Sequence, residues 1–177
     1  MAIPETELFR RHTAYHQAGH VIADLVSGYR FTFVTIKPDL KGEDDGGVCG
    51  NARGRARDLA VVQLAGIVSA AHKTGHDPWE KPDQFDDDSA DIATARIFVD
   101  EWAGFLSRTY GESSLKEQLW DEIRNKTRLL VDQNREAIEV IAQALLEKET
   151  LLYDDAIRIL KDHCCILQNP DRLQPAT

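Results

Sequence analysis

Long apolar runs are missing from this sequence of 177 residues. The longest mostly apolar stretches, 59–71 and 137–146, contain polar breaks and fall well short of the roughly 20 residues that a helix needs to span a bilayer. The N-terminal segment MAIPETELFRRH includes acids and lacks the apolar core and small-residue cleavage site of a secretory signal. We therefore expect a protein with no membrane segment that resides in the cytoplasm.

Cysteines are few, and basic residues are outnumbered by acidic ones. Cys49, Cys164 and Cys165 make an odd number, and the adjacent pair would need a strained bridge, so the pattern favours reduced thiols over a disulfide framework. The chain has 21 Lys and Arg against 30 Asp and Glu, which gives a formal net charge of −9. Because Lys and Arg supply most of the affinity for phosphate backbones, this balance argues against nucleic acid as a partner.

Helical patterning dominates the chain. Apolar or small residues recur at helical spacing over five segments: 5–26, 55–73, 86–102, 115–147 and 154–163. The fourth segment is almost uninterrupted and predicts one rod of roughly 50 Å at a rise of 1.5 Å per residue.

Strand signals are confined to one region. Residues 29–36 alternate and are rich in aromatic and β-branched residues, and the short segment 47–50 can pair back on them after an acidic, glycine-rich turn. The prediction is therefore a single, mainly α domain over residues 1–163, with a small β-hairpin or ribbon near residues 29–50 and a polar tail over residues 164–177.

The first predicted helix carries His16 and His20 four residues apart. Side chains at this spacing project from one face of a helix, about 5–6 Å apart at Cβ, so their rings can meet one Zn²⁺; they can equally be ordinary core or surface histidines. His12 extends the spacing by one turn and is expected to be exposed at the helix entrance. Gly19 costs about 1 kcal/mol inside a helix, which indicates close packing against a neighbouring backbone.

The residue between the two histidines decides what such a site can do. In zinc peptidases a Glu follows the first histidine and takes the proton from the attacking water. Gln17 occupies that position here, and a neutral amide can hydrogen-bond to the water but cannot accept its proton. A positioned general base is worth typically about 10²–10⁴-fold in rate, so the pattern predicts a site that is incomplete as a hydrolase.

The stretch AYHQAGH over residues 14–20 resembles the AYHEAGH signature of the FtsH-type zinc metallopeptidase domain, the proteolytic half of membrane-anchored AAA proteases. The likeness continues in order through four further segments: 34–38 with 46–48, 63–66, 89–95 and 134–151. It covers about residues 10–160, and it implies the fold of that peptidase domain.

The resemblance also implies a site and partners. It makes Asp91 the third zinc ligand beside His16 and His20, with a fourth position left for water; from the residues alone, Asp91 is an acid near a helix start. It further implies a polypeptide substrate or protein partner and a possible homo-oligomer. The chain departs from the family at Gln17 and at Ala90, where the family has Asn, and it has no ATP-binding motif, so any ATP dependence would come from a partner chain.

Asp87 and Asp88 precede Asp91 by four and three residues. Either can face the metal as a proton acceptor or an extra ligand, or both can belong to a solvated acidic first turn of the helix. Two functions follow from these residues. The first is a zinc metallopeptidase whose hydrolysis is weak or absent because of Gln17. The second is a pseudopeptidase, metal-binding or metal-free, that acts as a regulatory or protein-interaction module.

Overall fold

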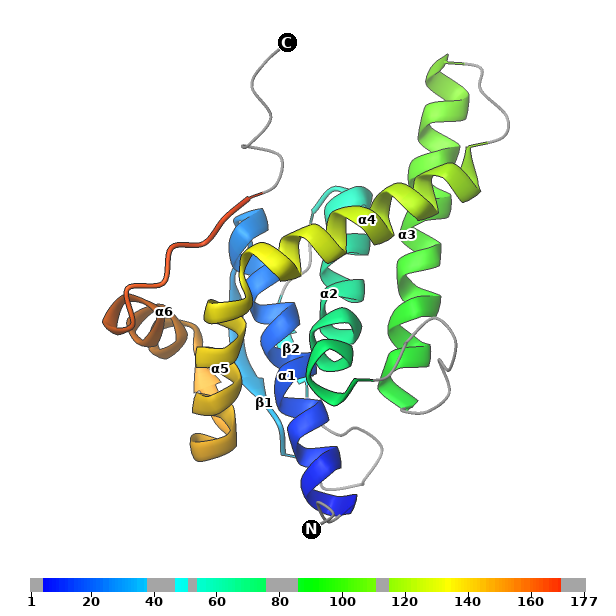
Figure 1. Cartoon of the computed structure of the whole chain (residues 1–177). Helices are drawn as coiled ribbons and strands as arrows, with labels where there is room; N and C mark the ends of the chain where they lie inside the picture. The colour runs from blue at the N-terminus through cyan, green and yellow to red at the C-terminus, as the bar shows by residue number, and fades with distance from the viewer. Residues whose placement is uncertain (1–4, 38–46, 51–53, 76–85, 111–114, 170–177) are drawn as a thin grey trace.

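The computed structural model of the chain describes residues 5–37, 47–50, 54–75, 86–110 and 115–169. Within these ranges the elements are, in chain order, α1 (Glu5–Ser27), β1 (Phe31–Thr35), β2 (Gly47–Gly50), α2 (Ala56–Thr74), α3 (Asp86–Tyr110), α4 (Lys116–Gln133), α5 (Arg135–Lys148), β3 (Thr150–Leu152) and α6 (Tyr153–Asp162). The described chain is mainly helical (Figure 1), which confirms the predicted fold class. None of these helices is long and apolar enough to cross a membrane.

The helix α2 lies at the centre of the protein and packs against α1, α3 and α4 (Figure 1). Every residue from Leu59 to Ala71 except Gln63 is buried, and the stretch contains no charged side chain. A helix that is apolar on all sides is stabilised by burial on all sides. It ends at Gly75, which adopts the left-handed φ of 76° and donates its N–H to the carbonyl of Ala71.

The crossing of α1 and α2 is unusually close at Gly19. A Cβ atom at this position would lie 2.3 Å from the carbonyl oxygen of Ala65 and 2.5 Å from Oγ of Ser69. Only glycine lets the two backbones approach in this way. The close packing expected from a glycine inside a helix is confirmed, and it brings the face of α1 that carries the histidines against α2.

The small sheet has the strand order β2-β1-β3, with both pairings antiparallel. Val34 of β1 pairs with Val48 on one side and with Leu151 on the other. The predicted hairpin near residues 29–50 is confirmed. The third strand was not predicted, because three residues are too few to show the alternation that marks a strand.

The prediction of one continuous helix over 115–147 is wrong. The helix α4 ends at Gln133 and α5 begins at Arg135, and the residue between them, Asn134, has a φ of −114° and a ψ of 20°. Its side chain donates to the carbonyls of Leu130 and Gln168 and accepts from the N–H of Gln168. A short polar side chain that competes for backbone groups favours such a break, and here it also ties the chain after α6 to the body.

The helix α3 is longer than predicted. The apolar pattern predicts an end near residue 102, but the helix continues to Tyr110. Ala103 is buried and Leu106 is partly buried against the core, so both extend the stripe that Val99 begins at a spacing of four and seven residues. The far end of α3 projects beyond the rest of the protein (Figure 1).

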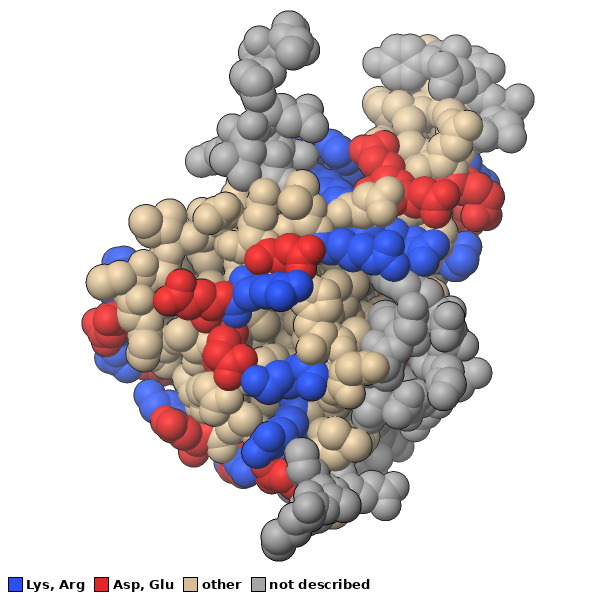
Figure 2. All heavy atoms as spheres, viewed as in Figure 1, with Lys and Arg blue, Asp and Glu red and all other residues tan. Residues whose placement is uncertain are grey.

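Charges of both signs stand side by side on the face of the molecule seen in Figure 2. Ion pairs among the described residues include Lys73 with Glu139, at 3.2 Å, and Arg135 with Asp132, at 2.7 Å. Exposed pairs of this kind contribute little to stability, typically below about 1 kcal/mol. The excess of acid in the composition is therefore not gathered into one acidic patch on this face.

Candidate metal centre

Three histidines of α1 face the interior. His12 and His16 are each 1% exposed and His20 is 8% exposed. The expectation that His12 is exposed is wrong, because Asp88 of α3 packs against its ring. The inner face of α1 thus presents imidazoles at three successive turns.

The structure brings His16, His20 and Asp91 together. Nε2 of His16 lies 2.9 Å from Nε2 of His20 and 2.9 Å from Oδ2 of Asp91, and Nε2 of His20 lies 3.0 Å from the same Asp91 oxygen. Donor atoms of a tetrahedral zinc site lie about 3.4 Å apart for metal–ligand distances of about 2.0–2.2 Å. These three atoms therefore need to open only slightly to hold one ion between them.

The rings of His16 and His20 each have a hydrogen-bond partner at Nδ1, the nitrogen that faces away from Asp91. These partners determine that Nε2 is the nitrogen free to accept or to bind a metal. Nδ1 of His20 lies 2.8 Å from the carbonyl oxygen of Val62, which can only accept, so Nδ1 carries a hydrogen. Nδ1 of His16 lies 3.2 Å from a carboxylate oxygen of Asp88, which likewise accepts. With neutral rings, both Nε2 lone pairs point at Asp91, whose Oδ2 has no hydrogen-bond partner among the described residues.

The carboxylates of Asp88 and Asp91 stabilise positive charge near His16 and His20. Burial lowers the pKa of His16, but Asp88 and Asp91 outweigh burial and raise it to about 9. Burial raises the pKa of Asp88, but contacts with His12 and His16 lower it to about 2. Burial likewise opposes the ionisation of Asp91, yet His20 and His16 hold its pKa well below the usual range. A proton on His16, or a cation among the three donors, supplies the charge that these carboxylates require.

The helix α2 forms one wall of the centre with its backbone. A Cβ atom at Gly66 would lie 2.5 Å from Nε2 of His20 and 2.9 Å from Cδ2 of His16, so the rings occupy the space that any side chain would need. The carbonyl of Val62, one turn earlier, holds His20. Sequence reasoning missed both contributions, since a backbone carbonyl carries no residue signature; the glycine was the only available signal.

The remaining predicted residues lie around the three donors. Gln17 is 4% exposed, and its Oε1 has no hydrogen-bond partner among the described residues. Asp88 is fully buried on the outer side of His16, away from the nitrogen that faces His20 and Asp91. Its other oxygen lies 3.6 Å from Nε2 of His12. The side chain of Asp87 lies outside the described part of the structure.

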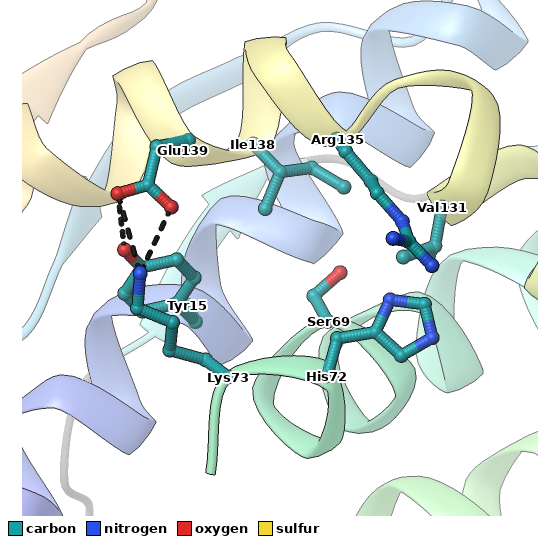
Figure 3. Close-up of a pocket in the computed structure, with 8 residues that line it drawn as sticks. All are labelled: Tyr15, Ser69, His72, Lys73, Val131, Arg135, Ile138 and Glu139. Carbon is teal, nitrogen blue, oxygen red and sulfur yellow. Dashed lines mark hydrogen bonds and ion pairs between the residues drawn. The ribbon is translucent and has the colours of Figure 1, made fainter. Parts of the chain in front are cut away.

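A separate cleft of about 160 Å³ lies between α1, α2 and the junction of α4 with α5 (Figure 3). Tyr15 borders it, and its hydroxyl donates to Glu139 of α5 at 2.7 Å. Lys73 of α2 donates to the same carboxylate and lies 4.7 Å from the centre of the Tyr15 ring. His16, His20 and Asp91 do not line this cleft. The contacts drawn in Figure 3 therefore join helices and are separate from the candidate metal centre.

Neither a protein-family model nor a curated protein matches this chain. The fold and the site define a mainly helical protein in which buried histidines of α1, together with the buried Asp88 and the partly buried Asp91 of α3, could hold a metal ion.

Proposed function

We propose that this protein binds zinc through His16, His20 and Asp91 and belongs to the FtsH-type class of metallopeptidase domains. The observation that carries the proposal is the convergence of three electron-pair donors within 3.0 Å of one another, with both imidazoles fixed from behind. Lone pairs at this separation repel one another unless a cation or a proton lies among them. The collinear likeness of the sequence to the peptidase domain is the second support.

The chemistry of the donors favours zinc. Imidazole nitrogens bind zinc and other late transition metals, whereas Mg²⁺ and Ca²⁺ take oxygen ligands almost exclusively. Two histidines and one carboxylate leave a fourth position open, which is the arrangement of catalytic zinc sites. When bound, zinc supplies Lewis acidity, which polarises a water molecule or a peptide carbonyl.

The residues that accompany the donors do not supply a base. Gln17 follows His16 directly, and its amide can orient a water molecule but takes no proton from it. Asp88 is fully buried, with its two oxygens toward His16 and His12, so it is not directed at a substrate. We therefore expect the protein to engage polypeptide with weak or absent hydrolysis, as a pseudopeptidase, because Gln17 lacks the function of the family's Glu.

Cleavage of a fluorescently labelled, unfolded protein tests this proposal. We would compare the wild-type chain, Gln17→Glu and the double variant Gln17→Glu/His16→Ala, each with zinc and with a chelator. We expect that, of the three proteins, only Gln17→Glu cleaves the substrate. We also expect that the chelator abolishes its cleavage. Equal cleavage by the wild type would mean that another group acts as the base. Absence of cleavage in every variant, together with absence of zinc binding, would overturn the proposal.

A further inference from the structure

We infer that Asp88 is a positioning residue that orients the metal ligand His16 and that His12 supports Asp88 in this role. The inference rests on the proposed function and concerns residues outside the three ligands. His12, Asp88 and His16 form a buried row from α1 to α3 and back to α1.

The geometry of this row is that of a carboxylate held between two rings. One oxygen of Asp88 lies 3.2 Å from Nδ1 of His16 and the other lies 3.6 Å from Nε2 of His12. Asp88 is 0% exposed and both histidines are 1% exposed, so water does not compete for these contacts. A metal-ligating histidine typically donates its other N–H to a carboxylate or a carbonyl, which fixes the ring and raises its strength as a ligand.

His12, His16 and Asp88 could also be read as a second cation site, since they offer three ligand atoms within 4.8 Å of one another. One chemical requirement argues against that reading. His16 would have to lose both ring hydrogens to bind one ion through each nitrogen. A single ion with an orienting carboxylate does not require this loss.

Charge balance gives Asp88 a second role. Asp88 and Asp91 bring two negative charges into a buried cluster, and an uncompensated buried charge is costly. One divalent cation with three neutral imidazoles balances both carboxylates. Without the carboxylate of Asp88, the same ion would leave the buried centre with a net positive charge.

The two histidine ligands are therefore held differently. His20 donates to the carbonyl of Val62, a neutral acceptor, whereas His16 donates to a carboxylate. The carboxylate strengthens the hydrogen bond and increases the electron density on Nε2 of His16. His16 is on this basis the stronger of the two imidazole donors, and it is the ligand that depends on Asp88.

The test measures affinity for Zn²⁺ by competition with a chromophoric chelator at pH 8, and the visible spectrum of the Co²⁺ form. We expect Asp88→Asn to weaken zinc binding by about 10–100-fold and to shift the Co²⁺ bands, while His16→Ala abolishes binding. Asp24→Asn is the matched control, because Asp24 is a partly buried carboxylate one turn beyond His20 that acts on that ring only through its charge.

Each outcome bears on one of the two proposals. If the wild type binds no zinc, the proposed function falls. If the wild type binds zinc and Asp88→Asn binds as tightly with an unchanged Co²⁺ spectrum, the positioning role is overturned. An equal loss in Asp24→Asn would also overturn it, in favour of a general charge effect. Circular dichroism of the metal-free variants checks folding. Should Asp88→Asn fail to fold, His12→Asn keeps the carboxylate and is expected to shift the Co²⁺ bands in the same direction with a smaller loss of affinity; unchanged bands and affinity in His12→Asn would overturn the inference.

Discussion

Gly66 and the ring of His20 leave no space between them. A Cβ atom at Gly66 would lie 2.5 Å from Nε2 and 2.7 Å from Cε1 of His20, and real Cβ atoms essentially never approach that closely. The ring is held in that position from its other nitrogen by the carbonyl of Val62 on the same helix, so it cannot turn away without losing a buried hydrogen bond.

A methyl group at Gly66 is therefore expected to damage the centre more than the fold. We predict that Gly66→Ala lowers zinc affinity by at least about tenfold, the lower end of the effect of losing a group that orients a ligand. Gly104→Ala is the control, because the same methyl group in α3 would meet only Nη1 of Arg108, at 3.5 Å. That change should leave zinc affinity unaltered and stabilise the helix by up to about 1 kcal/mol. Equal affinities in the two variants would contradict the packing argument.

Zinc is expected to stabilise the folded protein, because the ligands come from two helices that are held together only in the folded state. At a free zinc concentration about 100 times the dissociation constant, the free energy of unfolding should rise by about 2.7 kcal/mol. For a chain of this size that corresponds to about 5–10 °C in the melting temperature. Differential scanning calorimetry with and without zinc measures the shift, which Asp91→Asn should remove. A shift of the same size in Asp91→Asn would place the ion elsewhere.

Asn134 is predicted to contribute to stability through its side chain. Removing it in Asn134→Ala leaves the backbone N–H of Gln168 without the Oδ1 that accepts it and favours an unbroken helix that this site does not accommodate. The expected loss is about 1–3 kcal/mol in the free energy of unfolding, measured by urea denaturation. Asn125→Ala, at an exposed position inside α4, is the matched control and should be neutral or slightly stabilising. A loss in both variants would point to helix propensity and not to the contacts of Asn134.

Asp24 should give the metal-free protein a distinctive pH dependence. Burial raises the pKa of Asp24 to about 6. A carboxyl group with a raised pKa binds its proton more tightly in the folded state, so its contribution is complete below about pH 4 and is lost as the pH rises through about 6. As the pH rises from about 4, the free energy of unfolding of Asp24→Asn should therefore increase relative to that of the wild type. The increase should amount to at most about 3 kcal/mol and level off above about pH 7.

The quantity to measure is the difference in unfolding free energy between the wild type and Asp24→Asn. Asp88 and Asp91 have lowered pKa values, so their protonation in acid destabilises both proteins and cancels in this difference. Chemical denaturation at intervals between pH 4 and pH 8 gives it directly. A difference that does not vary with pH would show that Asp24 is solvated in the folded protein.

Sequence patterns were sufficient for the mainly helical class and the hairpin, because apolar periodicity is a local property of the chain. The spacing of His16 and His20 belongs to one helix and is equally local. Asp91 lies 71 residues after His20 in the sequence, and only the resemblance to a peptidase family linked it to the two histidines. The structure places these three side chains together.

Features that depend on the angle between helices could not be predicted in the same way. The burial of His12 and the contact of Asp88 with the outer nitrogen of His16 are set by how α3 lies across α1. Whether an acid in the first turn of a helix is solvated or buried is not encoded in that turn. The break at Asn134 had a local signal in the residue type, but the apolar stripe on both sides outweighed it.

The donors of the centre come from α1 and from the second turn of α3, and α3 is the helix whose far end projects beyond the body of the protein (Figure 1). In the proposed metal-bound protein, the ion would join the turn of α3 that carries Asp91 to His16 and His20 of α1. A small rotation of α3 on loss of that ion would move the far end of the helix more than the turn that carries Asp91. Binding of a metal ion at the buried centre would in this way affect the protein surface at the far end of α3.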